Sequence, residues 1–343
     1  MTEPIDTRIE EVRTELLSEV ALGVGETPPD EVGDLDAREG ISRTSRSPLQ
    51  LAWRRYWRHR GAAVSTVILA IMLLVVLATP LTARYGVTEA VRPSQNQFLP
   101  PQDVAWFGTN QLGRDVYSLL LVGVRTSLFI GVASAILSTV IGTAVGSFAG
   151  LRGGAFDNVM MRVTDLFLAF PFLVAIVIAR QLLGGLSFLD PIIGERTSIR
   201  FIIVLFAIFG WMIVARLVRG QVLALKEREF VEASRAAGAS DLRIVVAHLL
   251  PNSIGPVIVA LTLSVIAAVV GESTLSFFGF GPQPGAGSIS LGQLVQGAGA
   301  AARQGNWWLV VFPCGALVLL AVCINFIGDG LRDAFDPKMD GGH

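Results

Sequence analysis

Charged residues are scarce in this sequence of 343 residues. They make up 16% of the chain, whereas hydrophobic residues make up 52%, and ordinary soluble domains carry about 25% charged residues. The mean hydropathy is +0.59. This balance excludes an intrinsically disordered chain and argues against a soluble globular protein. Together with apolar runs of bilayer-spanning length, it predicts a polytopic membrane protein.

Lysine is especially rare, since the chain has only Lys226 and Lys338. A phosphate-binding loop of the G-x-x-x-x-G-K-[ST] type needs a glycine directly before its lysine. Leu225 and Pro337 occupy those positions, so the chain has no standard Walker A loop and no ATPase activity is expected from it. The formal net charge of −1 gives no global basic surface for nucleic acid.

Histidines and cysteines are too few and too widely spaced for the common metal sites. His59, His248 and His343 are never four residues apart, which excludes H-E-x-x-H. Cys314 and Cys323 lie nine residues apart, on opposite sides of one predicted helix, so they cannot form a disulfide within it or a metal site alone. We therefore predict no catalytic, cofactor or metal site in this chain.

Six apolar stretches predict an all-α membrane protein with six transmembrane helices. They lie at 62–81, 128–148, 166–178, 201–215, 254–270 and 309–327. The third and fourth reach the roughly 20 residues that a span needs only with their flanks, 162–183 and 200–218. Segments that alternate to the inside hold 14 Lys and Arg, and those outside hold eight. Because basic residues favour the cytoplasmic side, both termini are predicted inside.

Composition divides the chain into five parts. Residues 1–49 form an acidic tail with 12 acidic residues and five arginines, in which apolar residues from Ile5 to Val20 predict one amphipathic helix. That helix docks on a partner or belongs to a solvated or interfacial tail, and both interpretations stay open. The other parts are a first span with a basic-aromatic anchor (50–83), an extracytoplasmic loop (84–123), a core of five spans (124–330) and a C-terminal cytoplasmic tail (331–343).

Small and aromatic residues make further predictions about the spans. Small residues recur at every fourth position of the second span, at Ser134, Ser138, Gly142, Gly146 and Gly150, and such a stripe predicts close helix packing. Aromatic anchors at the two membrane surfaces are predicted at Trp53, Tyr56 and Trp57 and at Trp307 and Trp308. A nucleic-acid contact of the first cluster is less favoured. Pro171, Pro256 and Pro313 predict kinked or broken helices.

Ionisable residues are nearly absent from the predicted spans. Asp165 lies near the inner end of the third span, and Glu272 lies near the outer end of the fifth. Ion-coupled transporters usually place such acids at mid-membrane, so a secondary transporter is the remote alternative. Asp165 and Glu272 stay candidates for a translocation path or its mouth, and a structural role is the competing interpretation for Glu272.

The long inner loop at 216–251 predicts a helix, a turn and a second helix. Ala-, Glu- and Arg-rich sequence favours helix up to Ala237. Gly238 suits the left-handed position after a helix, and Ser240 can cap the next one, which we expect to end at Leu250-Pro251. Small residues at the bend would let another protein's surface approach closely.

This loop resembles the E-A-A-x3-G-x9-I-x-L-P signature of ABC importer permeases. The matching residues are Glu232, Ala233, Ser234, Gly238 and 248–251. Ser234 replaces the second alanine of the signature. His248 replaces its isoleucine, as in the peptide-permease variant H-x-L-P-N, which here continues with Asn252.

Four other segments resemble the C-type subunit of dipeptide, oligopeptide and nickel permeases. Residues 107–116 resemble F-G-T-D-x-x-G-R-D, with Asn110 where aspartate is usual, and Asp165 with Pro171 resembles D-x5-P at the start of the third span. Residues 272–279 resemble E-x-x-L-S-F-L-G, and 328–338 resemble G-D-G-L-R-D-A-L-D-P-R. The similarity covers about residues 50–338.

The resemblance implies a type I ABC importer permease fold in a prokaryotic plasma or inner membrane, and uptake of di- or oligopeptides. Its implied partners are a sister B-type permease forming the other half of the pathway, two ABC ATPase subunits that use ATP and Mg, and an extracytoplasmic substrate-binding protein. The chain itself would hold no cofactor. Nickel, glutathione or an oligosaccharide is the alternative substrate within the family.

The resemblance also gives two groups of candidate site residues. The coupling helix, seated in a cleft of one ATPase, would contain Glu232, Ala233, Ser234, Ala237 and Gly238. The candidates for an external gate or for docking the binding protein are Gly108, Thr109, Gly113, Arg114 and Asp115. A local salt bridge between Arg114 and Asp115, fixing the loop, is the alternative for that pair.

Overall fold

The computed structural model describes residues 48–86, 89, 91, 97–186, 188, 190–193, 198–282 and 289–335. The chain divides into two units, Met1–Pro48 and Leu49–His343. The amphipathic helix predicted in the acidic tail lies outside the described residues. The helices below belong to the second unit, apart from the first residue of α3.

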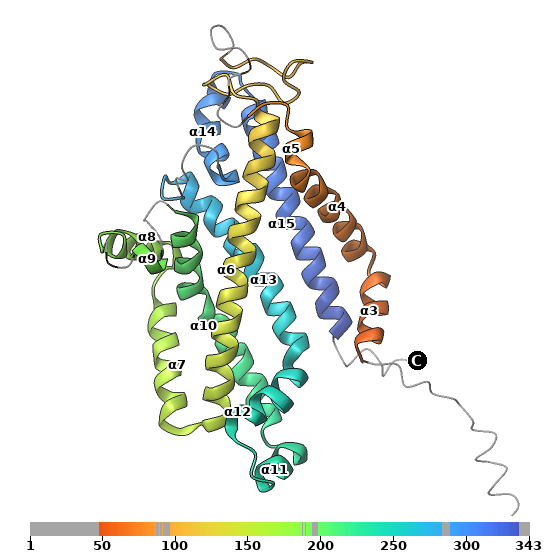
Figure 1. Ribbon diagram of the computed structural model, residues 1–343, viewed down its shortest axis with the longest axis vertical. Coiled ribbons are helices and arrows are strands. Elements are labelled where there is room, and N and C mark those ends of the chain that lie inside the picture. The colour runs from red at the N-terminus through yellow and green to blue at the C-terminus, as the bar shows by residue number, and fades with distance from the viewer. Residues whose placement is uncertain are drawn as a thin grey trace, which may run out of the picture. The chain divides into compact units, whose positions relative to one another are not determined.

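Almost all of the described residues form helices, as the sequence predicts (Figure 1). In chain order they are α3 (Pro48–Arg58), α4 (Arg60–Leu77), α5 (Thr79–Thr82), α6 (Val116–Arg152), α7 (Gly154–Ala169), α8 (Phe172–Leu183), α9 (Asp190–Ile193), α10 (Ile199–Leu225), α11 (Glu229–Ala236), α12 (Asp241–Ile244), the π-helical turn η2 (Val245–Leu249), α13 (Leu250–Phe277), α14 (Leu291–Arg303) and α15 (Trp308–Phe335).

Five of these helices are long and apolar enough to cross a membrane: α4, α6, α10, the continuous helix Asp241–Phe277, and α15. Helices α7 and α8 pass the same test only together, with a bend of 96° at the break between them, and counted as one broken span they give six. The third apolar stretch, predicted with its flanks at 162–183, therefore forms a broken helix, as Pro171 predicts. Pro171 explains the break, because the residue before a proline is driven out of the helical region, and Phe170 has an extended backbone (φ −87°, ψ 137°).

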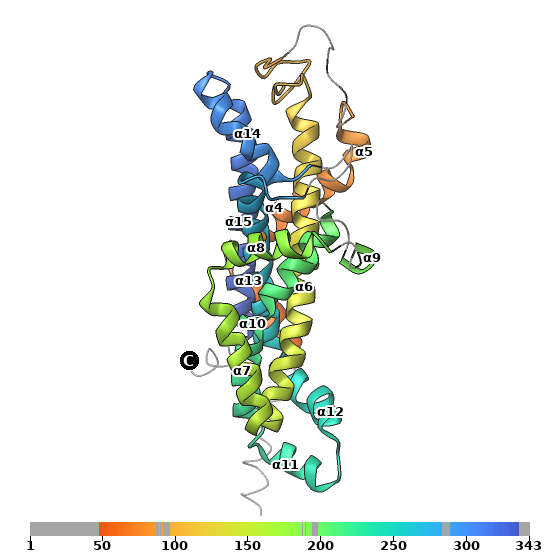
Figure 2. The same cartoon turned by 90° about the vertical axis from the view of Figure 1, so that its left-hand side faces the viewer.

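Successive long helices run in opposite directions, as Figures 1 and 2 show. The inner ends of the first and last spans meet on one side. Ala52 and Tyr56 of α3 pack there with Ala62 of α4 and Ala334 of α15. An even number of membrane crossings places both ends of this unit on the same side of the membrane, in agreement with the prediction. We call that side the inner end.

The small residues of α6 are packing residues, as predicted. A Cβ added to Gly142 would lie 2.5 Å from the carbonyl oxygen of Trp211, and one added to Gly146 would lie 2.4 Å from that of Ala215. Both neighbours are backbone atoms of α10, so neither can move aside cheaply. The stripe therefore lets α6 and α10 pack backbone to backbone.

Three helix boundaries differ from the prediction. Helix α6 begins at Val116, so the outer loop ends eight residues earlier than the predicted 123. Helix α10 runs to Leu225, which shortens the inner loop predicted at 216–251. Helix α15 continues to Phe335, so the C-terminal tail starts after the predicted 331. Apolar stretches mark only the part of a helix that lies in lipid, and polar helix ends beyond it carry no such signal.

The second helix of the inner loop does not stop at Leu250-Pro251. It passes through η2 into α13, with the proline in the first turn of α13. Proline lacks the N–H that an α-helix interior needs. The wider π turn just before Pro251 changes the pattern of backbone hydrogen bonds at the point where the proline has no N–H to donate.

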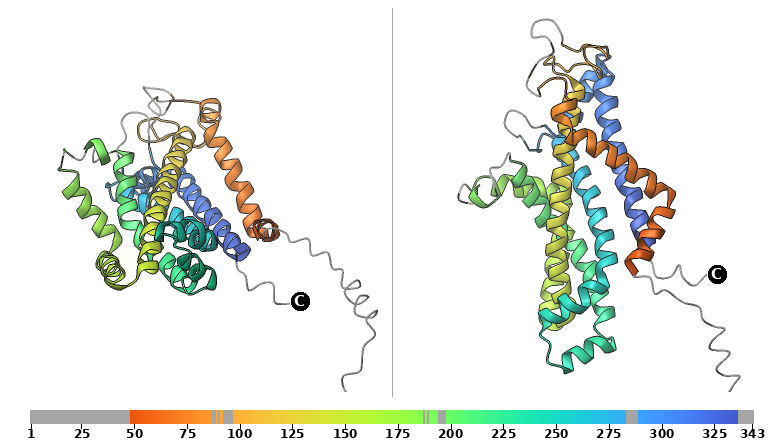
Figure 3. Two further views of the ribbon diagram at one scale, coloured as in Figure 1. Left: turned by 60° about the horizontal axis from the view of Figure 1, so that its bottom comes forward. Right: turned by 45° about the vertical axis from the view of Figure 1, so that its right-hand side comes forward.

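Only part of the predicted aromatic anchors faces outward. Trp53 and Trp57 on α3 are exposed by 66% and 43%, but Tyr56 is buried and bonds the Thr66 hydroxyl. Figure 3 shows the bend between α3 and α4, and Tyr56 packs there with Ala62 of α4 and Ala334 of α15. At the other end Trp307 is exposed, whereas Trp308 is buried and its Nε1 donates to the Thr109 carbonyl at 3.2 Å.

Candidate functional site

Helices α11 and α12 form a hairpin at the inner end of the bundle, as Figure 2 shows. Helix α11 ends at Ala236, and Gly238 follows in a left-handed conformation with φ +81°. The Ser240 side chain then caps α12 by accepting from the Arg243 backbone N–H at 3.4 Å. The predicted helix, turn and helix start are confirmed. We call residues 229–244 the hairpin.

The hairpin is attached to the ends of α6 and α10. Val231 is fully buried and packs in one apolar cluster with Val218 and Val222 of α10. Arg152, at the end of α6, holds Asp241 in an ion pair of 3.0 Å. Apolar packing and one ion pair therefore connect the hairpin to two spans.

The candidate coupling residues divide into an outer surface and an inward contact. Glu232, Ala233, Ala237 and Gly238 are exposed. A Cβ added to Gly238 would meet nothing within 4 Å, so the turn presents open surface. Ser234 is half-buried and points back toward η2. Contact of the outer surface with an ATPase stays a prediction.

Two aspartate–arginine pairs join α7 to α10 near this end. Arg219 binds both carboxylate oxygens of Asp157, at 2.5 and 2.6 Å. Arg216 pairs with Asp165 at a more exposed position. Asp165 is thus engaged with α10, and its candidacy for a translocation path is untested. The sequence predicts both arginines in a loop and does not single out Asp157. The sequence signal for Asp157 is its eight-residue spacing from Asp165, which puts the two acids on one helix face.

Most candidate residues of the outer loop are buried and hold the loop together. Gly108 has φ +76°, and a Cβ there would lie 2.6 Å from the Leu99 carbonyl oxygen and 2.7 Å from Trp308. Thr109 is fully buried, and its hydroxyl accepts from the Leu99 N–H at 2.8 Å. Gly113 is also buried, with φ +68°.

The side-chain oxygen of Asn110 accepts from the backbone N–H groups of Leu112 at 2.9 Å and Arg114 at 3.0 Å. An aspartate would use the same oxygen, so this departure from the resembled segment preserves the turn.

Asp115 is the N-cap of α6. Its carboxylate accepts from the Ser118 backbone N–H at 2.9 Å and from the Ser118 hydroxyl at 2.7 Å. No ion pair joins Arg114 to Asp115 in the described structure, so the alternative of a local salt bridge is wrong, although Asp115 does fix the local backbone. Arg114 is half-buried, and its role at a gate or docking surface stays a prediction.

Glu272 lies inside the protein, fully buried near the outer end of α13. Its carboxylate accepts from the hydroxyls of Ser127 at 2.9 Å and Ser276 at 2.5 Å. Ser127 in turn accepts from the Leu291 backbone N–H at 3.0 Å. The carboxylate thereby ties α6, α13 and the start of α14 together, in agreement with the structural interpretation of Glu272.

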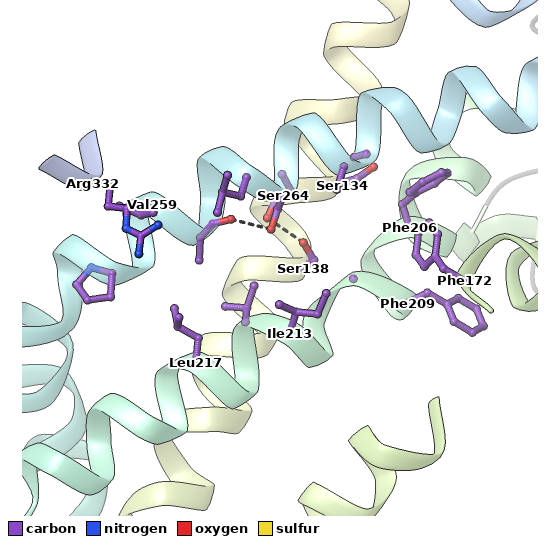
Figure 4. A pocket seen from close by; sticks show the side chains of 18 of the residues that line it. Ser134, Ser138, Phe172, Phe206, Phe209, Ile213, Leu217, Val259, Ser264 and Arg332 are labelled. Carbon is purple, nitrogen blue, oxygen red and sulfur yellow. Dashed lines mark hydrogen bonds between the residues drawn. The ribbon is translucent and has the colours of Figure 1, made fainter. Parts of the chain in front are cut away.

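A cavity of about 770 Å³ lies among α6, α10 and α13, with contributions from α7, α8 and α15 (Figure 4). Its lining is mainly apolar, and Ile213 and Leu263 leave 69% and 49% of their surface exposed. The hydroxyls of Ser138 and Ser264 donate to backbone carbonyls of their own helices at 3.0 and 2.8 Å. Arg332 is the charged residue of this lining. Large exposed apolar surface around a cavity is typical of an interaction or transport surface.

Comparison with known proteins gives two family matches. Residues 142–341 match the family described as "binding-protein-dependent transport system inner membrane component". Residues 47–101 match the "N-terminal TM domain of oligopeptide transport permease C". The two matches leave residues 1–46, 102–141 and 342–343 uncovered, and the first of these gaps ends close to the limit at residue 50 that the sequence resemblance gave.

Two similar proteins match this chain over most of the length of both sequences. The dipeptide transport system permease protein DppC of Bacillus subtilis is 38% identical over 301 residues, which are 88% of this chain and 89% of the relative. The oligopeptide transport system permease protein OppC of Mycobacterium tuberculosis H37Rv is 39% identical over 287 residues, 84% and 94% of the two chains.

Among solved structures, an inward-facing MetNI methionine ABC transporter chain aligns with a TM-score of 0.50 and 25% identity, covering 64% of this chain and 96% of that one.

Proposed function

Because the chain belongs to the family of binding-protein-dependent transport system inner membrane components, we propose that it carries di- and oligopeptides across the membrane as a permease subunit of an ATP-driven importer. Members of this family are membrane components of transport systems, so the chain is an inner-membrane permease and not a catalytic subunit. Its helices follow the fold of a type I ABC importer permease. The observation that carries the peptide assignment is the 38% identity to a dipeptide permease over 88% of the chain.

The proposed partners supply what this chain lacks. Two ATPase subunits would bind ATP with Mg and hydrolyse it, since this sequence has no Walker A lysine. A sister B-type permease would cover the open apolar face around the cavity and complete the pathway. An extracytoplasmic binding protein would deliver the substrate to the outer end.

The geometry supports a mechanical route from ATP to the cavity. The exposed turn at Gly238 would sit in a cleft of one ATPase, and closure of the two ATPases would displace the hairpin. The hairpin is anchored to α10 through Val231 and continues into α13 through η2. Helices α10 and α13 both line the cavity, so their movement would open or close the pathway.

Substrates other than peptides are less well supported. The lining of the cavity is mainly apolar, with serines whose hydroxyls bond their own helices. It has no histidine, cysteine or methionine among its described residues, and these side chains supply the nitrogen and sulfur ligands that transition metals favour, with imidazole suited to nickel. The relatives reported above are named for dipeptide and oligopeptide transport.

Uptake by the complete system tests this proposal. The chain is deleted in its native cells and restored from a plasmid, and entry of labelled dipeptide, hexapeptide and ⁶³Ni²⁺ is measured with and without depletion of ATP. We expect peptide entry to require both the chain and ATP, and nickel entry to be unaffected. Unchanged peptide uptake in the deletion, or ATP-independent uptake, would refute it.

A further inference from the structure

The two positions at which the inner loop departs from the resembled signature contact each other. Ser234 on α11 replaces an alanine, and His248 in η2 replaces an isoleucine. The Ser234 Oγ lies 3.0 Å from the His248 Nε2, a normal hydrogen-bond distance. An alanine and an isoleucine at these positions could not form this bond, so the pair gives this chain a polar link that the signature residues lack.

The direction of the bond follows from the number of available hydrogens. The Ser234 hydroxyl donates to the Phe230 carbonyl at 2.9 Å, and a serine has only one hydroxyl hydrogen. His248 Nε2–H must therefore donate to Ser234 Oγ. The imidazole ring also lies 6.1 Å from the Phe230 ring, centroid to centroid. Two residues one helical turn apart on α11 thus hold the His248 side chain.

His248 is itself fixed at the base of α13. It lies in η2 between the buried residues Val245 and Leu249. Its backbone carbonyl accepts from the side chain of Asn252, in the first turn of α13, at 2.6 Å. The same helix goes on to line the cavity at Gly255, Pro256 and Val259. A short path of contacts thus leads from α11 through His248 to the cavity.

The other contacts of α11 are less directional. Val231 packs by apolar contact, which resists separation but permits sliding and rotation. Gly238 is an open turn without neighbours around its Cα. A hydrogen bond loses strength steeply when its angle changes. Of these contacts, the Ser234–His248 bond is the directional one, so it constrains the rotation of α11 relative to α13.

We propose that Ser234 and His248 are positioning residues for energy coupling, which make α11 and the base of α13 move as one body. This inference rests on the proposed function, because it describes how displacement of the hairpin reaches the cavity. Without the bond, α11 would turn against η2 when an ATPase moves it, and ATP would be hydrolysed without movement of α13.

The test is the number of ATP molecules hydrolysed per peptide imported by the complete transporter in proteoliposomes. Ser234→Ala and His248→Leu should each raise this ratio about fivefold, the factor that corresponds to losing one hydrogen bond of about 1 kcal/mol. The double variant should be no worse than either single one, because the same bond is lost. Ser234→Thr and His248→Gln keep the hydroxyl and a donor nitrogen, and should stay near wild type.

Thr274→Ala is the matched control. It removes a hydroxyl that donates four residues back, to the Val270 carbonyl at 2.8 Å, at the outer end of α13, and should leave the ratio unchanged. Equal recovery of the ATPases with each variant is checked by co-purification. If His248→Leu does not assemble, the ratio is compared between wild type and Ser234→Ala, which removes only one oxygen atom.

A wild-type ratio of ATP hydrolysed to peptide imported in the assembled Ser234→Ala transporter would overturn the inference. Single variants whose effects multiply in the double variant would overturn it as well. Wild-type transporter that hydrolyses ATP but imports no peptide would instead refute the proposed function.

Discussion

Gly238 is the residue whose substitution tests the coupling surface most directly. Its backbone has φ +81°, and a Cβ there would meet no atom of this chain within 4 Å. A valine would therefore suffer backbone strain without any clash inside the subunit. For an L-residue this left-handed conformation costs about 1–2 kcal/mol, which lowers the population of the native turn by about five- to thirtyfold.

The chain contains a matched control for this strain. Gly305, in the turn after α14 at the outer end, has φ +83° and equally open surroundings. Gly305→Val should therefore have a similar cost for the fold. It lies far from the hairpin along the chain, and α14, which it follows, lies at the opposite end of the bundle from α11 (Figure 1), so only Gly238→Val should affect coupling.

The assay combines peptide uptake, ATP hydrolysis and recovery of the assembled complex. Gly238→Val should lower uptake by about five- to thirtyfold, following the strained turn, while the spans still insert. Gly305→Val should lower uptake only as far as it lowers the amount of expressed protein. Full uptake by Gly238→Val at normal expression would refute the coupling-helix assignment. Equal loss in both variants would show that the effect is general instability.

Three further predictions concern stability and assembly. Asp157→Asn and Arg219→Gln should each lower the unfolding free energy by about 1–3 kcal/mol. In thermal melts, the double variant should lose less stability than the sum of the two single losses, and additive losses would contradict the pairing. Gly146→Ala should destabilise by about 1–3 kcal/mol because its Cβ would meet the α10 backbone, whereas Gly297→Ala, on the open face of α14, should not; equal melting temperatures would rule out the close packing. Deleting residues 2–45 should leave the core inserted and assembled, and loss of ATPase co-purification would show that the tail docks on its partner.

The local features of the hairpin could be predicted because they depend on neighbouring residues. A glycine in the left-handed region ends α11, and a serine caps α12, and both preferences act within one turn of chain. The π turn could not be predicted in the same way. It depends on how buried Val245 and Leu249 pack against α10 while Pro251 withholds a donor, which is a balance between packing and backbone bonding.

In the outer loop, sequence motifs identify residues with specific contacts but do not predict what those contacts are. Gly108, Thr109 and Asp115 were identified as a group, and the structure shows them buried in contacts that fix the loop and the start of α6. Sequence spacing cannot distinguish a residue that faces a partner from one that faces the core. That distinction requires the burial of each side chain.

The sequence by itself determined the number of apolar spans, the all-α class, the hairpin and the family. Hydrophobic length and turn chemistry are properties of short segments, so they can be seen before any packing is known. Only the tertiary structure decided which aspartate meets which arginine, that Glu272 is buried under Ser127, and that Ser234 meets His248. Those partners are 14 to 145 residues apart in the chain. Their contacts depend on how the helices cross, and a helix crossing is set by the packing of both surfaces at once.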